Sequence, residues 1–458
     1  MVDTYFEIER SLQMQGTMSV AGAKNAVLVI MASLILTSGI SVLSNVPLSV
    51  DVKHMIALLE LLGAVVTIDA VHHRLIVDTS TINRWRVDSS LMKKTRASIL
   101  VMGPLLARFG RANIALPGGD AIGSRPINYH IRNFEKMGAQ VDVEVDCITA
   151  QANRLYGKTI VLDYPSVGAT ENIIMAATVA CGTTRIINAA LEPEVFDLID
   201  ILQKMGACIT VHVPATIEIV GVEALNAVEH SIMPDRLEAG ALLLAAAMTG
   251  GTVYVPDIRA HLLDSFLYKL EEMGHTIDIG IDGRGIRLKA ISDPLAVSFK
   301  TGPFPGFPTD LQAPMMAAQC IARGTSVIEE TVYESRFWHV SALKKMGAHI
   351  VIDGNKAIIT GVSELRGTTV MAGDIRASCA MVLAGLVARD ITCVYGVEHW
   401  HRGFESLEQK FVVLGANIKI GRAHMIADPI QKQITSEAKY NAYEIHALHD
   451  TILLKTAG

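Results

Sequence analysis

Aromatic residues make up only 5% of this 458-residue chain, although half of its residues are hydrophobic. Long apolar runs are also missing: the longest, residues 26–36, is broken by Ser33 and falls short of the roughly 20 residues that a membrane span needs. The start of the chain, with Asp3, Glu7 and Glu9, lacks the basic-then-apolar order of a secretory signal. We therefore expect no membrane segment and a cytoplasmic protein with an aliphatic core.

Cysteine is sparse and shows no pairing pattern. The six cysteines are dispersed, without a C-x-x-C pair or zinc spacing, which predicts reduced, mostly buried thiols. The Asp and His residues also lack metal-ligand spacing, so we expect neither a metal nor a cofactor. A formal net charge of -6 argues against a nucleic-acid partner, although it leaves room for a local basic pocket.

One short phrase, an apolar run ending in Leu-Gly or Met-Gly before a strand-like segment, occurs six times. Its glycines are spaced 75, 68, 68, 73 and 68 residues apart and are Gly63, Gly138, Gly206, Gly274, Gly347 and Gly415. A period of about 70 is longer than most solenoid repeats, so each copy is expected to be a compact α/β unit. Because a chain of this length normally divides, three units in each of two domains is the natural arrangement.

Each unit begins with a helix that is apolar on every side, and such a helix belongs inside a domain. The predicted buried helices cover residues 23–36, 96–106, 169–180, 237–248, 311–321 and 375–387. A β-branched strand, an amphipathic helix and a strand pair follow, and the repeated glycine fits a left-handed helix C-cap. The alternative, a doubly wound sheet, predicts longer βαβ units and a G-x-G-x-x-G after the first strand, which is not found there.

Polar groups crowd the starts of these apolar helices. They stand at or near Lys24, Arg96, residues 166–168, Asp235-Arg236, Asp310 and Asp374-Ile375-Arg376. Since helix N-termini carry free N–H groups and partial positive charge, such starts on one face would bind anions, and two faces across a cleft would enclose a multiply anionic ligand. Two alternatives stay open: Asp235 and Asp310 could be plain N-caps, and single arginines could be solvated side chains.

Two further segments stand apart from the repeat. The loop from Leu116 to Pro126 contains three glycines, two prolines, Asp120 and Arg125. This composition is typical of an active-site lid, and a surface turn is the alternative. Residues 424–458 have no counterpart in the units, and Ile434–Leu454 could form a helix there. We read this extension either as a loosely docked tail or as a partner-binding segment.

Ordered motifs over about residues 12–420 resemble a known enzyme family. They are A-G-A-K-N-A (21–26), T-R-A-S (95–98), the loop 116–126, S-V-G-A-T (166–170), E-P-E (192–194), P-D-R (234–236), F-P-T-D (307–310), E-S-R-F (334–337), D-I-R-A-S (374–378) and R-G (402–403). The chain resembles the UDP-N-acetylglucosamine 1-carboxyvinyltransferases, bacterial enolpyruvyl transferases that begin peptidoglycan synthesis. The resemblance implies two inside-out α/β barrel domains of three units each, residues 23–233 and residues 1–22 with 234–423.

The reaction implied by the resemblance transfers the enolpyruvyl group of phosphoenolpyruvate to the 3-hydroxyl of UDP-N-acetylglucosamine and releases phosphate. The implied catalytic residues are Asp120 as general acid, Asp310 as base near the accepting hydroxyl, and Lys24 and Arg402, which with Arg125 form the phosphoenolpyruvate clamp. Arg336 and Arg376 support that clamp. The implied nucleotide-sugar contacts are Asn25, Arg96, Arg125, Pro126, Ile127, Asn128, Tyr129, Tyr164, Ser166, Val167, Gly168 and Val332.

The chain departs from the family pattern at a few of these positions. Most members have cysteine where Asp120 stands, so fosfomycin, which alkylates that cysteine, should not inactivate this protein. Asn128 and Tyr129 replace a usual Asp-Leu beside the uracil, and His401 replaces a usual Asp. These departures keep two alternatives open: an enolpyruvyl transferase with another acceptor, such as another uridine nucleotide, or a catalytically silent binding protein. In either case we expect a monomer with small-molecule ligands.

Overall fold

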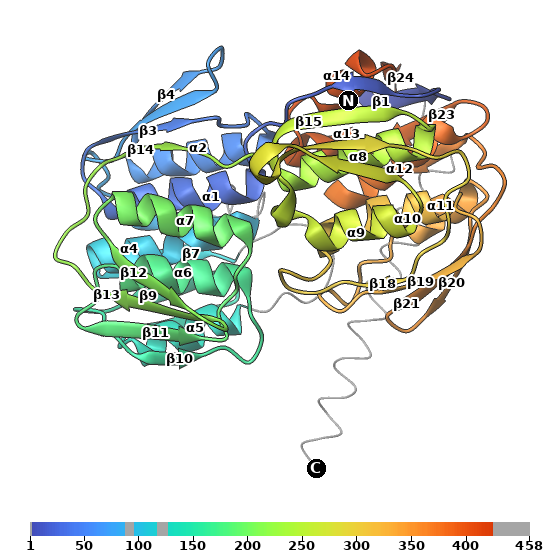
Figure 1. Cartoon of the computed structure of the whole chain (residues 1–458). Coiled ribbons are helices and arrows are strands. Elements are labelled where there is room, and N and C mark those ends of the chain that lie inside the picture. Colours follow the sequence, from blue (N-terminus) through green and yellow to red (C-terminus); the bar gives the residue numbers. More distant parts are fainter. Residues whose placement is uncertain (1, 88–95, 117–126, 425–458) are drawn as a thin grey trace.

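The chain folds into two lobes, each around its own hydrophobic core, in the computed structural model shown in Figure 1. The structure describes residues 2–87, 96–116 and 127–424. The buried residues of one core lie between Ala23 and Ile232. The other core combines residues 6–20 with residues 237–416. The N-terminal segment therefore packs with the second half of the chain.

The chain crosses between the lobes twice, and the two crossing segments lie side by side. The backbone N–H of Ala23 donates to the Met233 carbonyl at 2.7 Å, and that of Asp235 donates to the Ala21 carbonyl at 2.8 Å. These hydrogen bonds place the start of the first buried helix directly beside the start of the fourth.

Six four-stranded sheets share one strand order, in which a parallel edge strand is followed by three antiparallel neighbours. In the first lobe they are β14 (Glu229–Ser231), β3 (Ile40–Ser44), β5 (Arg74–Asp78) and β4 (Val65–Asp69); β6 (Arg86–Val87), β7 (Arg111–Ala115), β9 (Cys147–Gln151) and β8 (Gln140–Val143); and β10 (Thr159–Val161), β11 (Thr183–Ile187), β13 (Thr216–Val220) and β12 (Cys208–His212). Strand β14, late in the sequence, thus completes the first sheet of this lobe.

The sheets of the second lobe repeat that order. They are β2 (Gln15–Thr17), β15 (Thr252–Arg259), β17 (Arg284–Lys289) and β16 (Thr276–Ile279); β18 (Phe299–Lys300), β19 (Thr325–Glu329), β21 (Lys356–Thr360) and β20 (His349–Asp353); and β22 (Thr369–Met371), β23 (Thr392–Tyr395), β1 (Val2–Glu9) and β24 (Asn417–His424). Here the early strands β1 and β2 complete two sheets, so the second lobe takes both ends of the described chain. The six-fold repeat of the sequence is therefore a repeat of structure.

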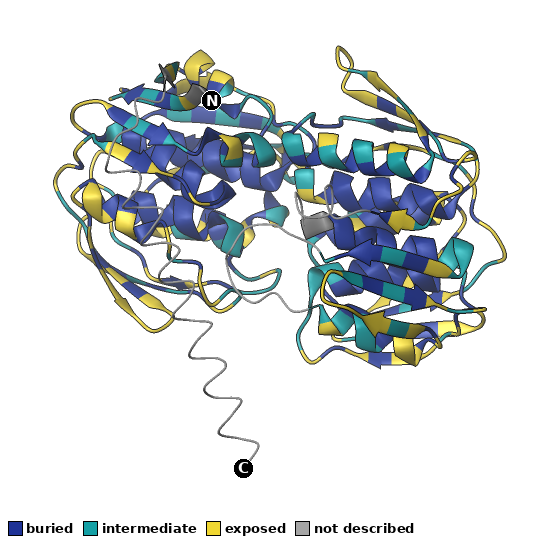
Figure 2. Ribbon diagram, turned by 180° about the vertical axis from the view of Figure 1, so that it is seen from behind, coloured by how far each residue is buried: buried dark blue, intermediate teal, exposed yellow. Residues whose placement is uncertain are grey.

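A buried helix opens each unit, as predicted. These helices are α1 (Lys24–Ser33) with the 3-10 helix η1 (Leu34–Leu36), η2 (Arg96–Val101) with α4 (Met102–Phe109), α6 (Val167–Ala177), α8 (Arg236–Thr249), η5 (Thr309–Leu311) with α10 (Gln312–Gln319), and α12 (Ile375–Val387). They run through the middle of the lobes, and exposed residues gather on the outer strands and loops (Figure 2). All of α8 is buried, which explains why its sequence has no polar face.

Two of the buried helices start differently from the prediction, as 3-10 turns. Pro104 is the third residue of α4, and Pro314 is the third residue of α10. Because proline has no N–H and its ring crowds the carbonyl four residues earlier, regular α-helix cannot extend much further toward the N-terminus. The residues before it therefore adopt the tighter helices η2 and η5.

Partly buried helices cover the units: α2 (Val50–Leu62), α5 (Asn128–Lys136), α7 (Pro193–Lys204), α9 (Asp264–Glu272), α11 (Val340–Lys345) and α14 (Leu407–Val413), with the short α13 (Val397–Gly403), η3 (Ala260–Leu262) and η4 (Ile281–Gly283). The repeated glycine follows the covering helix in every unit, with φ between 95° and 108°. The predicted left-handed positions are thus confirmed, and a side chain there would be strained.

Two composition-based expectations have different outcomes. All six cysteines are free thiols, but the prediction that most are buried is wrong: only Cys320 and Cys379 are buried, while Cys181 and Cys208 are exposed. Cys181 shortly precedes β11 and Cys208 is the first residue of β12, at surface positions where a small residue is tolerated without a packing role. In the described part of the chain, no helix has the length and hydrophobicity to cross a bilayer. The extension 425–458 and the loop 117–126 lie outside the described residues.

Candidate active site

A cavity of about 430 Å³ is lined by residues of both lobes. Every buried helix contributes the residues at or near its start: Lys24 and Asn25 from α1, Ile99 and Leu100 from η2, Val167 and Gly168 from α6, Arg236 and Leu237 from α8, Thr309 and Asp310 from η5, and Ile375 and Arg376 from α12. The six starts therefore converge on one space, and of the polar groups singled out in the sequence, Lys24, Ser166, Arg236, Asp310 and Arg376 line it.

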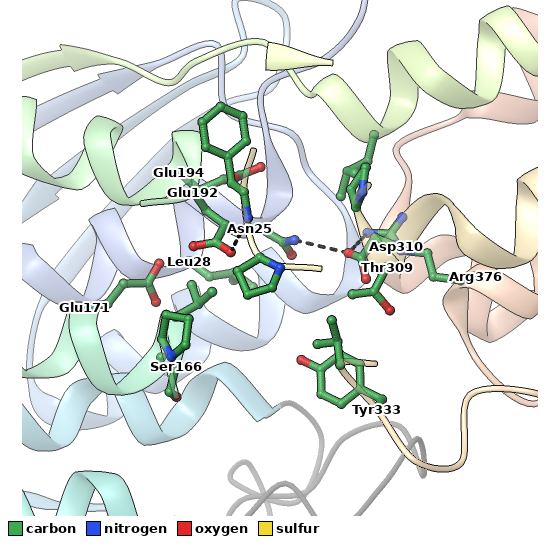
Figure 3. Close-up of a pocket in the computed structure, with 18 of the residues that line it drawn as sticks. Asn25, Leu28, Ser166, Glu171, Glu192, Glu194, Thr309, Asp310, Tyr333 and Arg376 are labelled. Carbon is green, nitrogen blue, oxygen red and sulfur yellow. Dashed lines mark hydrogen bonds and ion pairs between the residues drawn. The ribbon is translucent and has the colours of Figure 1, made fainter. Parts of the chain in front are cut away.

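Asp310 stands at the centre of one charge cluster. Its carboxylate accepts a hydrogen bond from Arg336 Nη2 at 2.6 Å and another from Arg376 Nη2 at 2.6 Å. Asn25 Nδ2 reaches it from the other lobe at 3.5 Å, the contact drawn in Figure 3. Burial alone would raise the pKa of Asp310, but the charges of Arg376 and Arg336 outweigh burial and hold that pKa well below its ordinary value. Asp310 is thus an ionised anchor for two cations in this state.

Asp51 organises a second cluster, which also joins the lobes. This first-turn residue of α2 lies 3.5 Å from Lys24 Nζ and accepts a hydrogen bond from Arg402 Nε at 3.0 Å. The Asp51 side chain is 3% exposed, whereas those of Lys24 and Arg402 are 13% and 15% exposed. All three residues line the cavity, and the two cations are the more exposed of them. Such a pair can face a dianionic group.

The third cluster is a buried ion pair across the cleft. Arg236, the first residue of α8, donates from Nε at 3.0 Å and from Nη2 at 3.1 Å to the two carboxylate oxygens of Glu194 on α7. Both side chains are under 10% exposed. Nearby, the backbone N–H of Phe304 donates to Glu192 Oε1 at 3.3 Å, again from one lobe to the other. These contacts fix the two walls relative to each other.

The two N-cap alternatives have opposite outcomes. Asp235 caps α8, because its carboxylate accepts from the N–H groups of Leu237 at 2.8 Å and Glu238 at 3.1 Å. Asp374 caps α12 in the same way. Asp310 makes no such cap, since its oxygens are taken up by arginines. A solvated role for the helix-start residues Arg236 and Arg376 is likewise wrong, as both are buried.

The predicted nucleotide-sugar contacts are partly brought together. Tyr129, Tyr164, Ser166, Val167, Gly168 and Val332 line the cavity. Burial raises the pKa of Tyr164 to about 12, so its hydroxyl remains a hydrogen-bond donor. Ile127 and Asn128, at the start of α5, do not belong to the described lining, and Asn128 is exposed. Asp120, Arg125, Pro126 and the side chain of Arg96 lie outside the described residues.

Sequence reasoning gave no role to several charged lining residues, among them Asp51, Glu171, Glu192 and Glu194. One of them carried a readable signal, because Glu171 is the one ionisable residue of a buried helix, where such a group is unfavourable without a function. The other positions resemble ordinary first-turn helix residues, and only the tertiary structure shows their partners. Conversely, His401 packs edge-on against the Phe6 ring, with centroids 6.1 Å apart, and is absent from the described lining.

The chain is similar to proteins of one enzyme family over most of its length. Residues 8–411 match the family model described as EPSP synthase (3-phosphoshikimate 1-carboxyvinyltransferase). The chain is 47% identical to UDP-N-acetylglucosamine 1-carboxyvinyltransferase 1 of Caldanaerobacter subterraneus subsp. tengcongensis, over 91% of this chain and 99% of that protein. It is 44% identical to UDP-N-acetylglucosamine 1-carboxyvinyltransferase of Geobacter metallireducens, over 90% and 98%.

Solved structures agree on the fold. The enolpyruvyl transferase NikO from Streptomyces tendae superposes with a TM-score of 0.84 at 23% identity, covering 93% of this chain and all of that one. EPSP synthase from Acinetobacter baumannii gives a TM-score of 0.71 at 16% identity, covering 91% of this chain and all of that one. The predicted fold of two three-unit α/β barrels is thereby confirmed. The chain belongs to the EPSP synthase family and, within it, to the UDP-N-acetylglucosamine 1-carboxyvinyltransferases.

Proposed function

We propose that this protein transfers the enolpyruvyl group of phosphoenolpyruvate to the 3-hydroxyl of UDP-N-acetylglucosamine and releases phosphate. The observation that carries the proposal is the meeting of two cation pairs, each held by a carboxylate, in a cavity shared by both lobes. Phosphoenolpyruvate has one phosphate and one carboxylate, so one pair is available for each. The full-length relatives named for this reaction support the same conclusion.

The chemistry needs a base, an acid and compensation for anionic charge. The base removes the proton of the sugar hydroxyl while its oxygen bonds to the central carbon of phosphoenolpyruvate, and an acid delivers a proton to the methylene carbon. The tetrahedral adduct then loses phosphate, and the new methyl group returns one proton, which restores the double bond. We assign the base to Asp310, the acid to Asp120 and the phosphate contacts to Lys24 and Arg402.

Asp310 can act as a base only when its contacts with the two arginines are weakened. With two arginines on its oxygens, the Asp310 carboxylate has a pKa well below the ordinary value and is a poor proton acceptor. A substrate carboxylate that takes over hydrogen bonds from Arg336 and Arg376 would free an oxygen of Asp310 and raise its basicity. Phosphoenolpyruvate would in this way activate the base. Asn25, already directed at Asp310 from the other lobe, is in a position to orient the sugar.

Phosphate release from phosphoenolpyruvate tests the proposal. The assay is run with UDP-N-acetylglucosamine, with UMP, and without an acceptor, for the wild type and for Asp120→Asn. We expect release only with the nucleotide sugar, and its loss in the variant. Release with UMP alone would reassign the acceptor, and no release with any acceptor would favour a silent binding protein.

We further propose that the protein works in the cytoplasm, in keeping with its free thiols, and that it is a monomer.

A further inference from the structure

One wall of the cavity is lined by carboxyl groups, which do not suit an anionic ligand. Glu171, Glu192 and Glu194 gather there, opposite Asp310 and Arg376, as Figure 3 shows. Arg236 lies beside them, but both of its hydrogen bonds to carboxylate oxygens go to Glu194. Glu192 has a buried oxygen, Oε2, without a hydrogen-bond partner among the described residues. A phosphate is therefore disfavoured at this wall.

Glu171 has no role in the proposed reaction. It projects from the second turn of α6 toward the cavity and is 4% exposed (Figure 3). No group in the described part of the chain hydrogen-bonds its carboxyl. An unpaired buried carboxyl costs stability, so a protein that keeps one at its cavity gains something from it when the cavity is filled.

The adjacent residue shows what a structural polar group looks like on the same helix. Asn172 accepts from the Gly103 N–H at 2.8 Å and donates to the Ile99 carbonyl at 3.0 Å, and its side chain contacts His130 Nδ1 at 3.0 Å. Its amide is fully engaged within the protein. Glu171, one position earlier and just as buried, has no such partners.

We propose that Glu171 is a specificity residue that hydrogen-bonds an uncharged hydroxyl or amide group of the nucleotide sugar. This inference rests on the proposed function for its ligand. Burial, with the neighbouring Glu194 and Glu192 charges, raises the pKa of Glu171 well above its ordinary value, which favours the protonated form of the carboxyl. A neutral carboxyl can donate one hydrogen bond and accept another, which matches a hydroxyl or an amide edge. The sugar and the uridine both offer such groups.

Thermal unfolding and ligand binding together test the proposal, with three variants. Glu171→Leu removes the polar group, Glu171→Gln keeps neutral hydrogen bonding, and Asn172→Leu is the matched control for a structural residue. Without ligand, we expect Glu171→Leu to raise the melting temperature by about 2–5 °C, and Asn172→Leu to lower it. With ligand, Glu171→Leu should weaken binding about tenfold and Glu171→Gln should bind nearly as well as the wild type.

Two ligands separate the possible partners of Glu171. Weaker binding of UDP-N-acetylglucosamine with unchanged binding of UDP would place the partner in the sugar, and weaker binding of both would place it in the uridine. Unchanged binding of both ligands to Glu171→Leu would overturn the proposal, and so would a loss of stability or folding like that of Asn172→Leu. Failure of the wild type to bind either ligand would instead refute the nucleotide-sugar assignment. The wild-type measurement therefore tests the proposed function independently of the role of Glu171.

Discussion

Removing one partner of the buried ion pair between Glu194 and Arg236 should lower the free energy of unfolding by several kcal/mol. Glu194→Gln removes the anion but leaves the Arg236 guanidinium buried, since the arginine side chain is only 7% exposed. Breaking a buried pair in this way costs about 3–5 kcal/mol. For a domain of about 200 residues, each kcal/mol lowers the melting temperature by about 2–4 °C, so we expect a fall of about 6–20 °C.

Differential scanning calorimetry is the suitable assay, because two cores can unfold in separate transitions and calorimetry resolves them. The matched control is Asp293→Asn, which breaks the exposed pair with Arg323 at 2.9 Å. With side chains 67% and 65% exposed, that pair should contribute under about 1 kcal/mol. Replacing both buried partners, as Glu194→Leu with Arg236→Met, should recover most of the loss because neither charge of the pair is left without the other.

The melting temperatures of these variants distinguish a desolvated ion pair from a solvated one. A Glu194→Gln protein that melts within 2 °C of the wild type, or no lower than the Asp293→Asn control, would refute the reasoning. It would mean that water reaches Arg236 through the cavity and solvates the charge. A recovered double variant would show that the large single effect comes from desolvation of the remaining charge, and not from the attraction alone.

Three other predictions concern the catalytic residues and pH. Asp310→Asn should lower kcat by about 10²–10⁴-fold in the phosphate-release assay, and activity within tenfold of the wild type would remove Asp310 as the base. Fosfomycin should cause no time-dependent loss, whereas Asp120→Cys should acquire a covalent adduct visible by mass spectrometry. Burial lowers the pKa of His275 to about 4 and that of His339 to about 3, so the unfolded chain binds more protons than the folded one and stability should fall as the pH drops from about 6.5 to 4. Leucine at both positions should make the melting temperature less dependent on pH over this range. An unchanged dependence in thermal melts would contradict the prediction.

The periodic part of the fold could be predicted from the sequence because each unit is specified locally. An apolar helix, a covering helix and a left-handed glycine each depend on residues within about 70 positions, as at Gly63 and Gly415. The exchange of β1, β2 and β14 between units could not be read from periodicity, since it joins strands far apart in the chain. The 3-10 starts at Pro104 and Pro314 were readable from proline chemistry, but the apolar pattern hid them.

The residues of the candidate site could also be predicted only where local sequence specifies them. Helix starts identified the cations, because a Lys or Arg at the start of a buried helix is unfavourable without an anion. Their pairing with carboxylates was missed because the partners come from distant sequence: Arg402 and Asp51 are 351 residues apart, and Arg376 and Asp310 are 66 apart. No local pattern encodes such pairs. Only Glu171, an acid inside an apolar helix, could have been suspected from its neighbours.

These partners change what the convergence of helix starts means for binding. The sequence predicts free cations waiting for an anion, whereas Lys24, Arg336, Arg376 and Arg402 already contact Asp51 or Asp310. An anionic ligand must therefore exchange partners with a carboxylate, and its net gain is the difference between two similar interactions. A stray anion that reaches only one cation pair gains little. A ligand with a phosphate and a carboxylate at the right separation can engage both pairs at once, so the built-in carboxylates convert a basic pocket into one that selects for a doubly anionic shape.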